Sequence, residues 1–93
     1  MNFEWDEQKA ELNKRKHGVS FEEAATVFDD ADALQIFDPD HSEAEDRFIM
    51  LGMSAVLRIL VVCHCYRADD NIIRIISARK ATRNESSTYE RRK

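Results

Sequence analysis

Apolar residues in the first third of the chain follow the period of an α-helix. They occur at positions i, i+3, i+4 and i+7, the spacing of one apolar helix face, in a stripe made by Phe21, Ala24, Ala25 and Phe28. Ser20 and Glu23 form a capping box at its start, in which each side chain bonds the backbone N–H of the other residue. The pattern therefore predicts a helix over residues 20 to 28 whose apolar stripe packs into the core.

A more polar helix is predicted before it, over residues 6 to 16. Asp6 is a suitable N-cap, and Gly18 can adopt the left-handed conformation that ends a helix. The last turn of this helix is positively charged, which the helix dipole favours without any ligand. Phe3 and Trp5, which precede the helix, indicate a short opening strand.

Further along the chain, the apolar residues form the short runs and alternations of β-strands. Strands are predicted over residues 33 to 37, 47 to 53, 57 to 66 and 72 to 78, with polar turns between them. The later connections are short enough for an antiparallel meander. The predicted fold class is α+β: two N-terminal helices packed on a three- or four-stranded antiparallel sheet, followed by a C-terminal helix, within one domain of residues 1 to 93.

Alternation along the strand at residues 57 to 66 separates two faces. One face is fully apolar and is expected to pack against the helices: Ile59, Val61, Cys63 and Cys65. The other mixes apolar and reactive side chains and is expected to be partly exposed: Arg58, Leu60, Val62, His64 and Tyr66. The cysteines lack the spacing of a zinc or redox motif, so they are interpreted as small core residues. The predicted core includes Phe21, Phe28, Ile59, Val61 and Ile75.

Charge is divided along the chain more sharply than the net charge of −4 indicates. Residues 1 to 46 hold 4 Lys or Arg and 14 Asp or Glu, a net charge of −10, whereas residues 47 to 93 hold 10 and 4, a net charge of +6. Such a division is typical of a protein whose basic part meets a polyanion. No apolar run reaches transmembrane length and no leader pattern opens the chain, so a soluble cytoplasmic protein is expected.

Cations gather where the last predicted strand meets the last predicted helix. Thr82 and Glu85 form a second capping box, which places the helix start at about Arg83. Arg79, Lys80 and Arg83 surround that helix N-terminus, where free N–H groups and the positive end of the helix dipole favour an anion. A phosphate site is therefore predicted here, and a solvated basic face is the alternative.

Three segments carry a family resemblance: FEWDEQK at residues 3 to 9, KHGVSFEEAATVF at residues 16 to 28, and RIISARKAT at residues 74 to 82. They resemble the BrnT family, the toxin half of a bacterial type II toxin–antitoxin pair. The resemblance implies a RelE-like fold and a ribonuclease that cleaves RNA and arrests translation. It also implies a BrnA-like antitoxin with a ribbon-helix-helix domain, in a complex that binds its own promoter DNA, and no membrane partner.

Cleavage of RNA without a metal needs a proton-transfer group, and cations that stabilise the charge developing on the phosphate. His64 is the predicted proton-transfer group, and Arg79 and Lys80 are the predicted catalytic cations. Substrate binding is assigned to Arg47, Arg58, Arg74 and Arg83. No metal or cofactor is expected. A lone strand histidine is also commonly structural, so that alternative stays open for His64.

The other two histidines have simpler interpretations. His17 is expected to cap its helix. His41 lies in an acidic loop, where Asp38 and Asp40 flank a proline and are interpreted as turn formers, although a weak metal site is conceivable. A different class of function also stays open, namely a binding module that recognises nucleic acid or protein without cutting it. No Ser-His-Asp, HExxH or DxD pattern in the sequence requires an enzyme.

Overall fold

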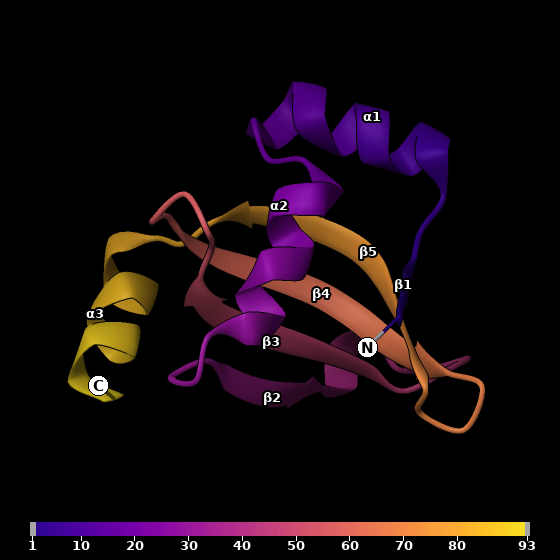
Figure 1. Ribbon diagram of the computed structural model, residues 1–93. Helices are drawn as coiled ribbons and strands as arrows, with labels where there is room; N and C mark the ends of the chain where they lie inside the picture. The colour runs from indigo at the N-terminus through magenta and orange to yellow at the C-terminus, as the bar shows by residue number, and fades with distance from the viewer. Residues whose placement is uncertain (1, 93) are drawn as a thin grey trace.

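The computed structural model describes residues 2 to 92, which form a five-stranded sheet with helices against it (Figure 1). The spatial order is β1-β5-β4-β3-β2, and the strands are β1 (Asn2–Glu4), β2 (Leu34–Asp38), β3 (Arg47–Met53), β4 (Ile59–Arg67) and β5 (Ile72–Lys80). The helices are α1 (Glu7–His17), α2 (Phe21–Thr26) and α3 (Arg83–Arg92), with 3-10 turns η1 (Val27–Asp29) and η2 (Pro39–His41). No helix in this part of the chain is long and apolar enough to cross a membrane.

The α+β class is confirmed, but the sheet differs from the prediction in strand number and direction. β2 to β5 form the predicted antiparallel meander. β1 adds a fifth strand that runs parallel to β5, so the sheet is mixed rather than antiparallel. The short opening strand indicated at Phe3 is present, but it has only 3 residues and its pairing of Asn2 with Ile72 joins distant parts of the chain. Neither local pattern nor loop length could indicate this strand pair.

The helix ends follow the predicted capping residues. The Asp6 side chain accepts a hydrogen bond from the backbone N–H of Lys9 at the start of α1. Gly18, with φ 69°, ends this helix and donates its N–H to the Lys14 carbonyl at 2.8 Å. Positive φ favours glycine because a Cβ there is strained. The Ser20 hydroxyl accepts from a backbone N–H in the first turn of α2.

The apolar face of α2 is shifted relative to the predicted stripe. The helix tightens into η1 after Thr26, and a 3-10 turn repeats about every three residues rather than every 3.6. The fully buried residues therefore follow at i, i+3 and i+6, and are Phe21, Ala24 and Val27. Ala25 and Phe28 pack only partly against this core.

The two faces of β4 are opposite to the prediction. Leu60, Val62 and His64 are fully buried on the face that packs against α2, together with Ile73 and Ile75. We call the opposite side of the sheet the outer face. The prediction places His64 on a partly exposed face because histidine is polar. Inside the core, however, each of its ring nitrogens lies within hydrogen-bond distance of a polar partner.

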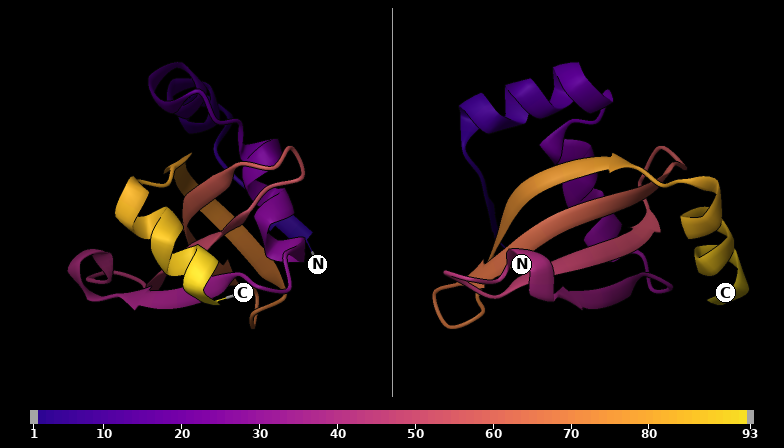
Figure 2. Two further views of the ribbon diagram at one scale, coloured as in Figure 1. Left: turned by 90° about the vertical axis from the view of Figure 1, so that its left-hand side faces the viewer. Right: turned by 180° about the vertical axis from the view of Figure 1, so that it is seen from behind.

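The outer face carries a smaller apolar cluster at one end, under α3. Tyr89 of α3 is buried there against Leu51 and Val61, and its hydroxyl donates to Asp30 at 2.6 Å. Burial raises the pKa of this hydroxyl. Figure 2 shows α3 at the end of the sheet where β5 finishes, with α2 on the other side of the sheet. Of the predicted core, Phe21, Ile75 and Val61 are buried, whereas Phe28 and Ile59 are half-buried.

Candidate functional site

The outer face holds a pocket with a volume of about 330 Å³, which we call the outer-face pocket. Its polar and charged lining residues are His17, Asp38, His41, Arg47 and Arg79. The sheet contributes apolar and small residues, among them Ile49, Val61, Cys63 and Ser77. Burial raises the pKa of the Cys63 thiol, which therefore stays protonated and unreactive. The pocket thus combines two guanidinium groups with two imidazoles on a largely apolar base.

Sheet register places the two arginines on the same side of the sheet. Arg79 of β5 lies opposite Val61, and Arg47 of β3 lies opposite Cys65, so both side chains leave the sheet on the outer face. Asp38, the last residue of β2, pairs with Arg47 in the sheet ladder. The pocket therefore brings together residues from the four strands β2 to β5, the turn η2 and the end of α1.

Arg79 is held by a carboxylate of the following helix. Its Nη1 and Nη2 donate to the two carboxylate oxygens of Glu85 at 2.8 and 2.9 Å, and Nη1 also donates to the Lys80 carbonyl. Glu85 completes the predicted capping box by accepting from the Thr82 N–H, while the Thr82 hydroxyl accepts from the Glu85 N–H. A guanidinium has five N–H donors. The Arg79 side chain is thus fixed in place, with donors left over for an anion.

The ion pair between Arg79 and Glu85 should make stability depend on pH. The Arg79 hydrogen bonds lower the pKa of Glu85 from 4.5 to about 2. The folded state then binds this proton less readily than the unfolded state, so the stabilisation is complete above about pH 4.5 and is lost as the pH falls toward 2. Since both side chains are partly exposed, the effect should be about 1 kcal/mol or less. Glu85→Gln should flatten the pH dependence of the free energy of unfolding in urea.

The matched control for this experiment is Glu90→Gln on the same helix, because Glu90 is exposed and has no arginine partner among the ion pairs of residues 2 to 92. It should keep the unaltered pH dependence between about pH 4.5 and 2. If the free energy of unfolding depends on pH equally steeply in Glu85→Gln and in the unaltered protein, the ion pair does not have the role given to it.

Arg47 is less well satisfied than Arg79. Its Nε is buried and finds no hydrogen-bond partner within residues 2 to 92. The nearest carboxylate oxygen, Oε1 of Glu45, lies 3.6 Å away, which is beyond hydrogen-bond distance. A buried N–H without an acceptor costs free energy, and an anion in the pocket would remove that cost. Of the two arginines, Arg47 therefore has the less complete set of hydrogen bonds, although its Nε forms an ion pair with Glu45.

His41 and Asp38 form a hydrogen-bonded pair at the pocket. The His41 Nδ1 lies 2.8 Å from Oδ2 of Asp38, whose residue is only 8% exposed. An ionised carboxylate only accepts, so Nδ1 carries the proton and Nε2 is left as an acceptor. Asp40 donates its backbone N–H to Asp38, and its own carboxylate takes no part in this hydrogen bond. No group of three His, Cys, Asp or Glu side chains that could hold a metal ion occurs in the described part of the chain.

The comparisons with known proteins agree with this architecture. Residues 5 to 85 match the family model of the ribonuclease toxin BrnT of type II toxin–antitoxin systems. The chain belongs to the BrnT family. A crystal structure of the ribonuclease toxin BrnT from Brucella abortus is 26% identical in sequence, with a TM-score of 0.65 over 89% of this chain and 99% of that one. A search of curated proteins found no significant match.

Membership of the BrnT family confirms the resemblance found in the sequence. The family consists of ribonuclease toxins of type II toxin–antitoxin systems. An RNA substrate and an antitoxin partner follow from that description.

Arg58 and Lys80 lie on the α2 side of the sheet, away from the outer-face pocket. The Arg58 guanidinium bonds both carboxylate oxygens of Glu23, with Nε 2.9 Å from Oε2, and reaches the Gly18 carbonyl at 3.0 Å. The Arg58 hydrogen bond lowers the pKa of Glu23, and the nearby charge of Lys80 lowers it further. Glu23 is therefore used by Arg58 and the Ser54 hydroxyl instead of closing the predicted capping box.

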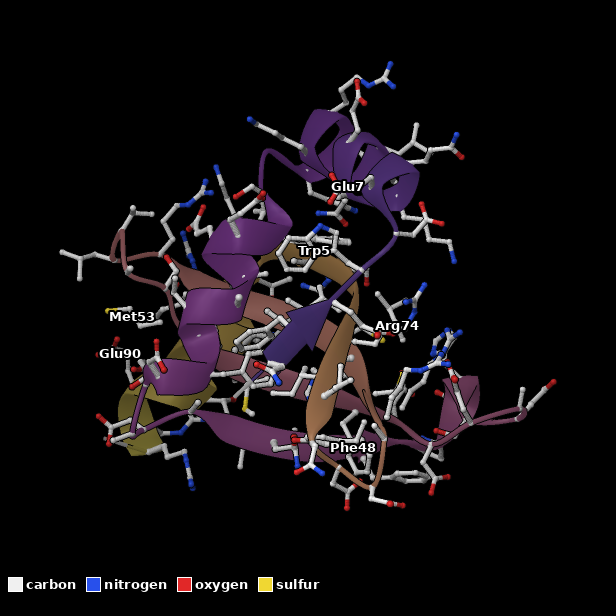
Figure 3. The ribbon with its side chains drawn as sticks, turned by 45° about the vertical axis from the view of Figure 1, so that its right-hand side comes forward. Trp5, Glu7, Phe48, Met53, Arg74 and Glu90 are labelled. Atoms are coloured by element: carbon white, nitrogen blue, oxygen red, sulfur yellow. The ribbon has the colours of Figure 1, made fainter. Side chains whose placement is uncertain are left out.

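Arg74 and Arg83 stand apart from the pocket as well. Arg74 donates to Glu4 at 2.8 Å, at the opposite end of β5 from Arg79, and Figure 3 shows it beside β1 and away from α3. Arg83 is exposed at the start of α3. Since Glu4 and Glu23 neutralise arginines from the basic half, the charge division along the sequence is not kept as a division in space.

His64 is not on an exposed surface, which corrects the prediction for its face. It is 0% exposed, and its Nδ1 and Nε2 lie 3.1 Å from the Val62 carbonyl and 2.8 Å from the Gln35 side chain. Its ring packs edge-on against Phe28, with centroids 4.8 Å apart. Burial lowers the pKa of this imidazole. These contacts give His64 a structural place in the core.

Proposed function

We propose that this BrnT-family chain is a metal-independent endoribonuclease whose outer-face pocket holds the scissile phosphate, and that it arrests translation. The observation that carries the proposal is the convergence of Arg47 and Arg79 on one pocket that also holds a histidine–carboxylate pair. Two cations and an imidazole supply charge stabilisation and proton transfer, so the chemistry needs no metal.

The two arginines have different parts in this proposal. Negative charge grows on the non-bridging phosphate oxygens as the 2′-oxygen attacks phosphorus, and fixed donors stabilise that charge without reorganising. Arg79 is fixed by Glu85, and Arg47 offers a buried Nε that lacks an acceptor within residues 2 to 92. Both line the same pocket from different strands, which suits a phosphate held between them.

The remaining predicted cations take lesser roles. Arg83 and Lys80 are exposed near the end of β5, where they can contact flanking phosphates of the RNA. Arg58 and Arg74 are held by Glu23 and Glu4, so we assign them to the fold rather than to RNA.

The proposal is tested by incubating the purified chain with RNA, and with translating ribosomes, and mapping the cut ends. Cleavage of free RNA should persist in EDTA and leave 2′,3′-cyclic phosphate ends. Cleavage that EDTA abolishes would point to a metal nuclease, and no cleavage of free or ribosome-bound RNA would favour a binding module.

We further propose that the antitoxin is of the BrnA type, that its ribbon-helix-helix domain carries the complex to promoter DNA, and that an acidic segment covers the outer-face pocket. Masking of the two arginines would neutralise the toxin. Expression of the chain alone should stop amino-acid incorporation, and co-expression of a neighbouring ribbon-helix-helix protein should restore it. Charge reversal at Arg47 and Arg79 should weaken both this restoration and the co-purification of the two proteins. If both stay unchanged, the antitoxin binds elsewhere.

A further inference from the structure

We propose that His41 is the proton-transfer group of the outer-face pocket and that Asp38 is its positioning residue. This inference rests on the proposed ribonuclease function, because it names the base of the same site. It differs from the sequence-based assignment, which gave the role to His64.

The geometry around Asp38 fixes the His41 ring relative to Arg47. Asp38 is nearly buried, and its Oδ1 accepts from the backbone N–H of Asp40 at 3.2 Å while Oδ2 accepts from His41. The Ser42 hydroxyl donates to the Asp38 carbonyl and accepts from the Arg47 N–H at 2.9 Å. The turn that carries His41 is thereby tied to the strand that carries Arg47. A base and a phosphate-binding cation are thus held on one rigid unit.

The exposure of His41 suits contact with a large substrate. Its side chain is 65% exposed, whereas its partner carboxylate is shielded, so RNA can reach Nε2 while Asp38 holds Nδ1. Asp38 keeps the proton on Nδ1 and stabilises the imidazolium that forms when Nε2 takes up a second proton. These are the roles expected of a general base and of the carboxylate that orients it.

Other groups near the pocket are poorer bases. Glu85 is bonded by Arg79, and with a pKa of about 2 it binds protons too weakly. Burial keeps the Cys63 thiol protonated. His17 has no hydrogen bond or ion pair to a carboxylate within residues 2 to 92, and so lacks an orienting partner.

The proposed step forms one P–O bond and breaks another, and the proton lost by the 2′-hydroxyl is balanced by one gained by the 5′-oxygen. His41 Nε2 takes the proton of the 2′-hydroxyl as the 2′-oxygen forms a bond to the adjacent phosphorus. The bond from phosphorus to the 5′-oxygen breaks with its electron pair, and that oxygen takes a proton from solvent water. His41 then returns its proton to solvent. The products are a 2′,3′-cyclic phosphate and a 5′-hydroxyl, with no oxidation or reduction.

The main test compares His41→Gln with the unaltered chain on an RNA that the unaltered chain cleaves. Glutamine can still donate to Asp38 but cannot transfer a proton, so kcat should fall about a hundredfold to ten-thousandfold. KM, the melting temperature and binding of the fully 2′-O-methylated RNA should stay unchanged, because the His41 side chain is mostly exposed. Asp38→Asn should lose part of the same rate.

Two further measurements separate chemistry from structure. In His41→Ala, added imidazole should restore part of the cleavage rate, which a merely structural role would not allow. Asp40→Asn changes a neighbouring exposed carboxylate that the His41 ring does not contact, so it should cleave at the unaltered rate.

The outcomes distinguish this inference from the function on which it rests. If the unaltered chain cleaves RNA and folded His41→Gln cleaves equally fast, the role of His41 is overturned and the ribonuclease function stands. Loss of methylated-RNA binding in His41→Gln, or a loss of rate that imidazole does not rescue, would also overturn it. If the unaltered chain cleaves neither free nor ribosome-bound RNA, both proposals fail together.

Discussion

Replacing Arg79 by alanine should lower the rate of RNA cleavage by about a hundredfold or more, because it removes a fixed donor to the charge developing on the phosphate. The effect should appear in kcat, since that charge grows mainly in the transition state. The fold should persist, because the Arg79 and Glu85 side chains are both partly exposed and their ion pair contributes about 1 kcal/mol or less. Single-turnover cleavage and thermal melting of the same preparation measure the two effects.

A control is needed because the substitution also frees a carboxylate beside the pocket. In Arg79→Ala, Glu85 loses its partner and could repel RNA on its own. The double variant Arg79→Ala, Glu85→Gln removes both charges and should be as slow as the single variant. Arg15→Ala removes an exposed arginine of α1 that also pairs with a glutamate, Glu11 at 4.0 Å, and it should cleave normally.

A normal rate in folded Arg79→Ala would contradict the pocket as the site of the scissile phosphate. A double variant at Arg47 and Arg79 that still stops growth would strengthen that result. The search would then move to the α2 side of the sheet, where Arg58 and Lys80 lie around Glu23.

Elements with local signals could be predicted closely from the sequence. Caps are set by residues within one turn of a helix end, so Asp6, Gly18 and Thr82 mark the ends of α1 and the start of α3. β3 coincides with the predicted strand at residues 47 to 53. These features depend on neighbours in the chain, which a sequence displays directly.

The faces of β4 could not be predicted because both are covered. α2 packs on one face and Tyr89 of α3 packs on the other, so apolar residues occur on both and polarity does not separate them. His64 suggested that its face is exposed, but it is buried, and its ring contacts the side chain of Gln35, which lies 29 residues earlier on another strand. When a buried polar group contacts a residue far away in the sequence, the neighbouring residues show no pattern that reveals it.

The candidate site was predicted in part. Arg79 and Arg47 are predicted from the sequence because arginine is the usual phosphate ligand, but their presence in the lining of one pocket depends on strand register. The hydrogen bonds of Arg58 and Arg74 could not be predicted, because their partners, Glu23 and Glu4, lie 35 and 70 residues away. His41 did have a local signal: a turn that begins at Asp38 before a proline places a side chain three residues later over its carboxylate.

The largest loss of stability is expected from Phe21→Ala, which should cost about 3 to 5 kcal/mol of unfolding free energy. Phe21 is the first residue of α2 and is fully buried, with its ring centroid 6.0 Å from that of Trp5. Its removal leaves a cavity in the core between α2 and the sheet, where the rigid sheet cannot close in to refill the space. A small domain has only about 5 to 15 kcal/mol to lose, so much of the variant should be unfolded at 37 °C.

Urea unfolding followed by circular dichroism measures this loss, and the slope with denaturant should stay unchanged if only the native state is weakened. Leu12→Ala is the matched control, because Leu12 is a large apolar residue on α1 that is 59% exposed. Its substitution should change the unfolding free energy by about 0.5 kcal/mol or less. A cost for Phe21→Ala below about 1 kcal/mol would mean that α2 does not pack on the sheet through this face. Because α2 and the outer-face pocket lie on opposite sides of β4, the residual folded Phe21→Ala should still cleave RNA at the unaltered kcat per folded molecule.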